Sequence, residues 1–277
     1  MIRLIATDLD DTLLNPQGDI NPRVQRALSD AMALGCGIVL ASGRMLEAME
    51  PLARRVGVNA PMLLYNGALA YDLNTGATLF ADQIPYETAQ AIADLIEGAG
   101  YYLQCYPGRG YYCNKILDCT RRYAASIRVE PIETGMPIAQ WMRKHPSGMQ
   151  KLLLIDTPEG ADRAKEMLQS AFPGAATFFK SRAPYVEIAP QGVDKGRSLE
   201  RLYTLLGLSR DEVMAFGDGQ NDVTMLRAAG TGVCMENGCP QAKDAATRIA
   251  PPNTEDGVAA VIEEYIQKGL IGSYRQK

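Results

Sequence analysis

The sequence has one histidine and one tryptophan among its 277 residues. Its six cysteines form no Cys-x-x-Cys pair and lie at no zinc-finger spacing from His145. A structural zinc site is therefore not expected. The thiols are interpreted as ordinary core or surface residues of a protein in a reducing compartment.

Long apolar runs and an excess of positive charge are also missing. No segment approaches the roughly 18 apolar residues that a membrane-spanning helix needs, and the acidic Asp8 comes too early for a signal sequence. The 28 Lys and Arg against 32 Asp and Glu leave a net charge of −4, which does not favour a polyanionic partner. We expect a cytoplasmic protein with neither a nucleic-acid nor a membrane partner.

The composition is that of a folded chain, with 47% hydrophobic and 22% charged residues. At both ends of the chain, short apolar runs alternate with helical patterns, as in a parallel sheet with helical crossovers. The apolar runs are Ile2–Asp8, Gly37–Ala41, Pro61–Tyr65, Val213–Phe216 and Gly232–Met235. The middle of the chain has short, aromatic-rich strands of a different character. We predict an α/β fold, with a Rossmann-like parallel-sheet core at 1–82 and 189–277, interrupted by an inserted α+β domain at 83–188.

Three of the predicted strands are each followed by a polar cluster. The clusters are Asp8-Leu9-Asp10-Asp11-Thr12, Ser42-Gly43-Arg44 and Gly217-Asp218-Gly219-Gln220-Asn221-Asp222. In an open parallel sheet, ligands bind outside the carboxyl ends of the strands. The three clusters are therefore predicted to meet in one crevice.

This crevice would gather four acids, namely Asp8, Asp10, Asp218 and Asp222. Two carboxylates about 4 Å apart repel by roughly 4 kcal/mol at an effective dielectric constant of 20. Protons or a divalent cation must therefore offset their charge. Oxygen ligands without a neighbouring His or Cys favour Mg²⁺ over zinc.

A phosphoryl group beside Mg²⁺ would need further positive charge and hydrogen-bond donors. Lys195 can supply the charge, while Ser42 and the backbone N–H groups around Gly43 and Arg44 can supply donors at a helix start. Asp8 is suited to attack phosphorus as a nucleophile. Asp10, two residues later, is placed to act as the general acid and then the general base.

These motifs resemble the haloacid dehalogenase-like phosphohydrolase superfamily, and within it the Cof-type phosphatases with a large α/β cap inserted after the third strand. The Asp8 segment looks like the nucleophile motif and Ser42-Gly43-Arg44 looks like the second motif. Asp194-Lys195-Gly196 resembles the lysine motif, and the segment Gly217–Asp222 resembles the metal motif. The resemblance spans the whole chain.

The resemblance implies Mg²⁺ bound by the Asp8 carboxylate, the Asp10 backbone carbonyl and Asp218, with support from Asp222. It also implies that Asn221 lies near the phosphate and that Asn66, at the end of the third strand, faces the substrate. Asp11 is a minor departure, because many members of the family carry Gly there, although Asp is common at this position too.

The sequence thus predicts a Mg²⁺-dependent phosphatase that hydrolyses a small phosphorylated metabolite (a sugar phosphate, a nucleotide or a cofactor phosphate) through an aspartyl-phosphate. Two alternatives stay open. A phosphosugar mutase would return the phosphoryl group to a sugar, and a regulatory module would use the same scaffold without catalysis. A nicotinamide-binding Rossmann enzyme is excluded, because Asp222 stands where the third glycine of that motif belongs.

Overall fold

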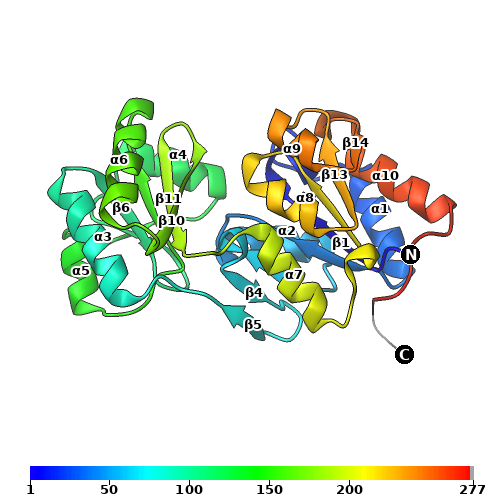
Figure 1. Ribbon diagram of the computed structural model, residues 1–277, viewed down its shortest axis with the longest axis horizontal. Helices are drawn as coiled ribbons and strands as arrows, with labels where there is room; N and C mark the ends of the chain where they lie inside the picture. Colours follow the sequence, from blue (N-terminus) through cyan, green and yellow to red (C-terminus); the bar gives the residue numbers. More distant parts are fainter. Residues whose placement is uncertain (275–277) are drawn as a thin grey trace. The chain divides into compact units, whose positions relative to one another are not determined.

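The computed structural model describes residues 1–274 of the chain. The chain forms two compact units, which are labelled by element in Figure 1. The first unit comprises Met1–Gly43, Glu50–Phe80 and the chain from Asp194 onward. The second unit comprises Arg44–Met49 and Ala81–Val193. The insertion expected at 83–188 falls within the second unit, and its assignment as a cap domain stays a prediction.

The first unit is built on a five-stranded parallel sheet in the order β14-β13-β12-β1-β2. Its strands are β1 (Leu4–Thr7), β2 (Gly37–Leu40), β12 (Val213–Gly217), β13 (Thr231–Met235) and β14 (Arg248–Ala250). Every residue of β1, β2 and β12 is buried. Burial on both faces explains why these strands are continuous apolar runs rather than alternating patterns.

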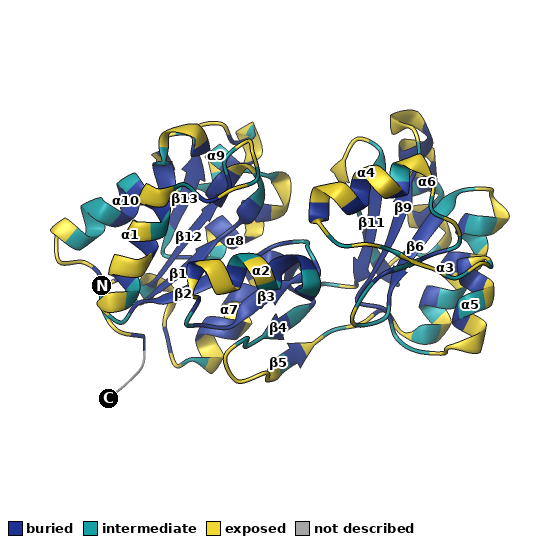
Figure 2. Ribbon diagram, turned by 180° about the vertical axis from the view of Figure 1, so that it is seen from behind, coloured by how far each residue is buried: buried dark blue, intermediate teal, exposed yellow. Residues whose placement is uncertain are grey.

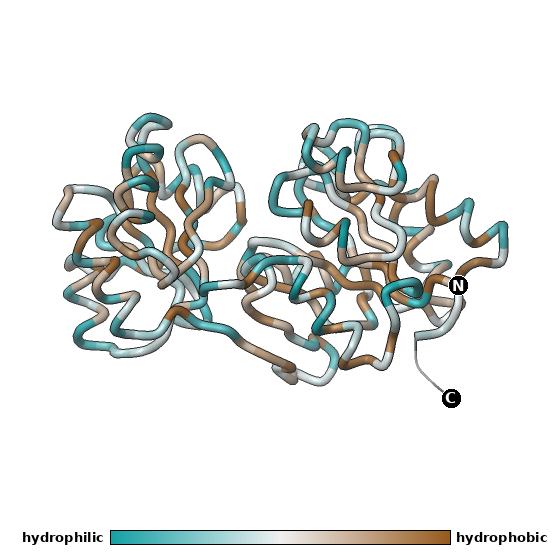
Figure 3. Tube along the Cα trace, viewed as in Figure 1, coloured by the Kyte–Doolittle hydropathy of each residue, from teal (hydrophilic) through white to brown (hydrophobic). Residues whose placement is uncertain are grey.

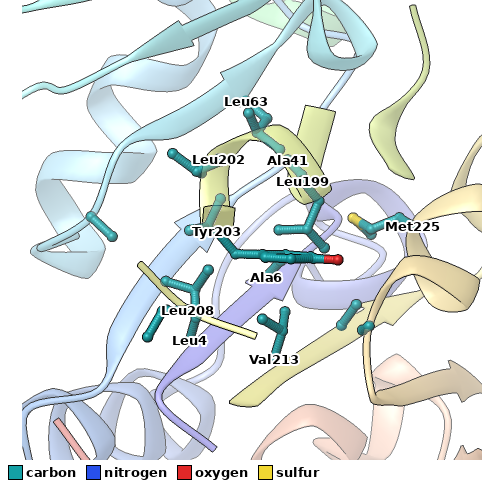
Figure 4. Packing of buried hydrophobic residues seen from close by; sticks show 14 of the residues in the cluster. Leu4, Ala6, Ala41, Leu63, Leu199, Leu202, Tyr203, Leu208, Val213 and Met225 are labelled. Carbon is teal, nitrogen blue, oxygen red and sulfur yellow. The ribbon is translucent and has the colours of Figure 1, made fainter. Parts of the chain in front are cut away.

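Helices cover this sheet. They are α1 (Pro22–Ala33), α2 (Leu46–Val56), α7 (Lys195–Leu205), α8 (Val223–Ala228), α9 (Pro240–Ala245) and α10 (Gly257–Gln267). Leu199 and Leu202 of α7 belong to the same buried cluster as Leu4 and Ala6 of β1, which Figure 4 shows. Helices α1 and α10 contact each other and the edge strands β2 and β14. The packing of α7 on β1 places the first turn of α7 near the carboxyl end of the sheet.

The third predicted strand differs from the expectation. β3 (Met62–Leu64) pairs antiparallel with β4 (Leu69–Tyr71) in a separate sheet that continues to β5 (Thr78–Ala81). A parallel bridge between Ala41 and Leu63 joins β3 to the parallel sheet next to β2, in line with the expected direction of this strand. Tyr65 and Asn66 both have positive φ (53° and 57°) and directly follow β3. They reverse the direction of the chain, so that β3 and β4 pair as a hairpin.

The second unit has a six-stranded sheet in the order β10-β11-β9-β6-β7-β8. Its elements are α3 (Tyr86–Gly98), β6 (Tyr102–Tyr106), β7 (Tyr112–Cys113), α4 (Asp118–Ile127), β8 (Ile132–Glu133), α5 (Ile138–Lys144), β9 (Lys151–Ile155), α6 (Pro158–Ala171), β10 (Ala176–Arg182) and β11 (Tyr185–Pro190). Apolar side chains of α3, α5 and α6 form one core with one face of this sheet. Figures 2 and 3 show buried and hydrophobic segments along the inner strands of each unit.

The predicted α/β class, with a parallel-sheet core and additional α+β structure, is confirmed. Among residues 1–274, none of the helices combines the length and the apolar composition that crossing a bilayer demands.

An ion pair at the entry to β12 generates a prediction for acid stability. Glu212 accepts hydrogen bonds from Arg3 (2.7 Å) and from the backbone N–H of Ser209 (2.9 Å), and these lower its pKa from 4.5 to about 2. The ionised carboxylate therefore stabilises the native state above its unfolded pKa, and this contribution is lost as the pH falls from about 4.5 to about 2.

We expect Glu212→Gln to lose less stability on acidification than the wild-type protein. Urea unfolding at pH 7, 4 and 3 measures the difference. Glu200→Gln, on the exposed side of α7, is the control, since it removes the same charge and keeps the Arg3 pair. Identical pH dependence of wild type and Glu212→Gln would contradict this assignment.

Candidate active site

Two neighbouring strands bring the acidic clusters together. Asp8 directly follows β1, and its N–H donates to the carbonyl of Phe216 in β12 (3.0 Å). Asp218 directly follows β12. Carboxylate oxygens of Asp8, Asp218 and Asp222 all lie within 4.8 Å of one another. These three side chains, up to 214 positions apart in the sequence, thus form one acidic group, as convergence of the parallel strand ends predicts.

Lys195 is the charged partner of this group. It is the first residue of α7, and it is fully buried at 0% exposure. Its Nζ donates to Asp8 Oδ1 and to Asp222 Oδ1, the latter at 2.6 Å. The N-cap Asp194, whose side chain accepts the N–H of Arg197 (2.9 Å), starts the helix so that Lys195 occupies its first turn. The lysine is therefore held by two carboxylates rather than exposed at the helix surface.

Asp222 holds the metal-motif loop in place. While Oδ1 accepts from Lys195, Oδ2 accepts the backbone N–H groups of Asp218 (3.1 Å) and Gly219 (2.9 Å). A Cβ at Gly217 would lie 2.5 Å from Asp222 Cβ, so this position has room only for glycine. Asp222 consequently orients both Lys195 and the backbone that carries Asp218.

Thr12 links the nucleophile motif to the metal motif. Its hydroxyl donates to Asp218 Oδ1 at 2.6 Å. Thr12 belongs to the predicted nucleophile motif, but no role was expected for it from the sequence. Its position four residues after Asp8, in the loop that follows β1, was the available signal, but the partner 206 residues away could not be identified without the sheet.

Four of the predicted phosphate-binding residues are joined by backbone and side-chain contacts. Ser42 is 2% exposed, and its carbonyl accepts the N–H of Asn66 (2.9 Å). The Asn66 side chain accepts from Asn221 Nδ2 (3.3 Å). It also lies 2.9 Å from where a Cβ of Gly43 would stand. Ser42, Gly43, Asn66 and Asn221 are therefore neighbours.

The other two predicted site residues, Asp10 and Arg44, lie outside the acidic group. Asp10 follows Asp8 in the short η1 helix (Leu9–Leu13) and is half-buried, and its carboxylate is not one of the three in the acidic group. Arg44 is half-buried and belongs to the second unit. The roles of these residues, like those of the whole predicted set, stay predictions.

Burial and neighbouring charges shift the pKa values of Asp8, Asp218 and Lys195. Burial, with repulsion from Asp222, raises the pKa of Asp8 well above its usual range, although Lys195 opposes the shift. Burial raises the pKa of Asp218 to about 6, reinforced by Asp222 and Asp11 and opposed by the Thr12 hydrogen bond. Burial by itself lowers the pKa of Lys195, but the attraction of Asp222 and Asp8 outweighs it and raises that pKa.

The donor set fits a divalent cation. Three carboxylates face one ammonium group, so the buried group carries more negative than positive charge when ionised. The available donors are oxygens, which Mg²⁺ prefers. Since Asp222 is already engaged through both oxygens, Asp8 and Asp218 are the carboxylates best placed to contact an ion directly, with the Asp10 backbone carbonyl as the further candidate.

The chain is similar to known hydrolases and phosphatases along nearly its whole length. A profile described as haloacid dehalogenase-like hydrolase matches residues 5–262. A putative phosphatase of Streptococcus pyogenes is 29% identical over 96% of this chain and 98% of its own length. A pyridoxal phosphate phosphatase of Escherichia coli is 27% identical over 95% and 98%. A crystal structure from Thermotoga maritima superposes with a TM-score of 0.85 and 33% identity, covering 95% of this chain and 97% of that one.

The buried lysine allows a direct stability prediction. Lys195→Met leaves Asp8 and Asp222 buried without their common counter-charge, so we expect the free energy of unfolding to fall by about 3–5 kcal/mol at neutral pH in metal-free buffer. Urea unfolding measures the loss. The control is Lys268→Met, which removes an exposed pair with Glu264 and should have a much smaller effect. A loss no larger than that of the control would show that Lys195 does not compensate the acids.

Proposed function

Because the chain belongs to the haloacid dehalogenase-like hydrolase family and is a phosphatase, we propose that it hydrolyses a small phosphorylated metabolite with Mg²⁺ through an aspartyl-phosphate. The observation that carries this proposal is the buried Lys195 held by Asp8 and Asp222, next to Asp218. These side chains bring one ammonium group and three carboxylates together. A phosphoryl group in transfer needs both a nucleophile and positive charge beside it.

Asp8 is the proposed nucleophile. One of its carboxylate oxygens attacks phosphorus, and the bond from phosphorus to the substrate's bridging oxygen breaks. Asp10 gives its proton to that departing oxygen, which leaves as an alcohol. The phosphoryl group is then an acyl phosphate on Asp8, so the difficult hydrolysis is divided into two steps.

The second step releases inorganic phosphate. Asp10, now ionised, takes a proton from water as the water attacks phosphorus, and the bond between phosphorus and Asp8 breaks. Lys195 offsets the negative charge around Asp8 throughout, and Ser42, Gly43 and Asn221 are the proposed donors to the phosphoryl oxygens. Mg²⁺, when held by Asp8, Asp218 and the Asp10 carbonyl, supplies additional positive charge for these oxygens.

Asp222 and Asn66 take supporting roles in this proposal. Asp222 orients Lys195 and the Asp218 loop through the bonds described above, and Asn66 holds Asn221. The second unit is the proposed cap that selects the leaving group, and Arg44, as part of that unit, is a proposed substrate contact. A small metabolite as substrate agrees with the name of the relative that acts on pyridoxal phosphate.

The nucleophile assignment is tested by Asp8→Asn. An amide is a poor nucleophile, so turnover of 4-nitrophenyl phosphate should fall by at least roughly a thousandfold. Asp30→Asn, an exposed substitution on α1, is the matched control for loss of an acidic group. Turnover of Asp8→Asn close to that of Asp30→Asn would refute the assignment. Analysis of the product with hexose phosphates separates phosphate release from transfer to a second sugar position, which the mutase alternative requires.

Cation dependence is tested by removing and restoring the metal. After dialysis against EDTA, the repulsion among Asp8, Asp218 and Asp222 is offset only in part, by Lys195. Phosphate release should therefore fall to background and return with Mg²⁺ but not with Na⁺ at equal ionic strength. A colorimetric phosphate assay follows the recovery. Full activity in the presence of EDTA would contradict the proposal for Mg²⁺.

A further inference from the structure

The loop between Asp8 and the first helix has an unusual backbone. Within η1, Asp10 is extended (φ −69°, ψ 127°) and Asp11 is left-handed (φ 60°, ψ 7°). A left-handed conformation costs an L-residue roughly 1–2 kcal/mol, although Asp tolerates it better than most. Such a conformation persists where surrounding contacts determine it. In this protein, side chains from two other loops contact the backbone of the segment.

Two asparagines from distant loops hold this segment at two points. Asn237, after β13, donates from Nδ2 to the carbonyl of Asp11 (2.7 Å). Asn253, after β14, donates from Nδ2 to the carbonyl of Leu14 (2.8 Å). Asn237 Oδ1 also accepts the backbone N–H of Asn253 (3.0 Å). The two side chains therefore form one connected clamp across the loop.

The clamped segment carries residues of the proposed chemistry. Asp10, the proposed acid and base, immediately precedes Asp11. Thr12, whose hydroxyl holds Asp218 at 2.6 Å, immediately follows it. The Asp11 carbonyl belongs to the peptide that joins Asp11 to Thr12. The bond from Asn237 to the Asp11 carbonyl fixes the orientation of that peptide.

We propose that Asn237 and Asn253 are positioning residues that hold Asp11 left-handed and thereby fix the positions of Asp10 and Thr12. This inference rests on the proposed function for the role of Asp10. Neither asparagine contacts the reacting atoms in this proposal, since both act through the backbone of the nucleophile loop. The clamp joins the loops after β13 and β14 to the loop after β1, three strand ends of one sheet.

Asn237→Ala is the informative substitution, because Asn237 is exposed whereas Asn253 is buried at 8% exposure. Removing the amide should lower kcat for 4-nitrophenyl phosphate by roughly tenfold to a hundredfold, since small misplacements of reacting groups have effects of that size. KM should change by less than about twofold if substrate binding does not depend on the clamp.

A matched control separates positioning from general loss of a surface hydrogen bond. Asn74 is an exposed residue in the β4–β5 turn, and its Nδ2 donates to the carbonyl of Val58 (3.0 Å). Asn74→Ala therefore removes an equivalent side-chain bond to a backbone carbonyl away from the nucleophile loop. Its kcat should stay within about twofold of wild type.

A second substitution tests the conformational cause. Glycine adopts positive φ without the penalty that a Cβ imposes. The factor by which Asn237→Ala lowers kcat should therefore be at least about threefold smaller in an Asp11→Gly background than in the wild-type background. A merely structural contribution of Asn237 would give the same factor in both backgrounds, and that result would overturn the proposal.

Hydrogen exchange measured by mass spectrometry supplies a readout that needs neither activity nor metal. Amides of residues 9–14 should exchange faster in Asn237→Ala than in wild type and Asn74→Ala. Wild-type protein without phosphatase activity would refute the proposed function, and the exchange rates would still decide on the clamp. Unchanged exchange at 9–14, or a kcat of Asn237→Ala equal to that of Asn74→Ala in an active protein, overturns the inference.

Discussion

The site depends on one buried ammonium group shared by two carboxylates. Lys195 is fully enclosed, and its charge would be costly to bury without the oxygens of Asp8 and Asp222 around it. The same pairing opposes the rise in the pKa of Asp8 that burial causes. Burying the lysine without the two carboxylates, or the carboxylates without the lysine, would be costly. The fold must therefore place the three side chains together.

The parallel sheet makes this placement possible. β1 and β12 are adjacent and in register, so the loops that follow them begin at the same edge. Asp222 then uses its second oxygen to hold the backbone of Asp218 and Gly219. Glycines at 217 and 196 let the loop and the helices approach, because a Cβ at Gly196 would lie 2.3 Å from the carbonyl oxygen of Thr224. Chain packing and site chemistry therefore rely on the same few residues.

Hydrogen bonds to the loop that contains Asp11 also come from residues late in the sequence. Loops after β13 and β14 contribute Asn237 and Asn253, which reach back to the first loop of the protein. Asp11, in that first loop, has a left-handed backbone conformation. An aspartate at a position that suits glycine needs external support, and the two asparagine side chains are in contact with that part of the backbone.

Much of the fold could be predicted from local pattern. The apolar runs of β1, β2, β12 and β13 lie where the sequence indicated, because burial on both faces of a sheet leaves a clear signature in composition. β3 was expected in the parallel sheet and pairs mainly with β4 instead. Both arrangements bury Met62, Leu63 and Leu64, so hydrophobicity alone could not choose between them.

The sequence by itself determined which residue types stand at the strand ends, and so it indicated acids, a lysine and a phosphate-binding loop. Only the tertiary structure decided that Thr12 holds Asp218, that Asp222 orients Lys195, and that Asn237 and Asn253 hold the loop of Asp11. The reason is physical. Residue type and spacing follow local rules of hydrophobicity and turn formation, whereas a hydrogen bond between residues 27 to 239 positions apart exists only when the sheet brings their segments together.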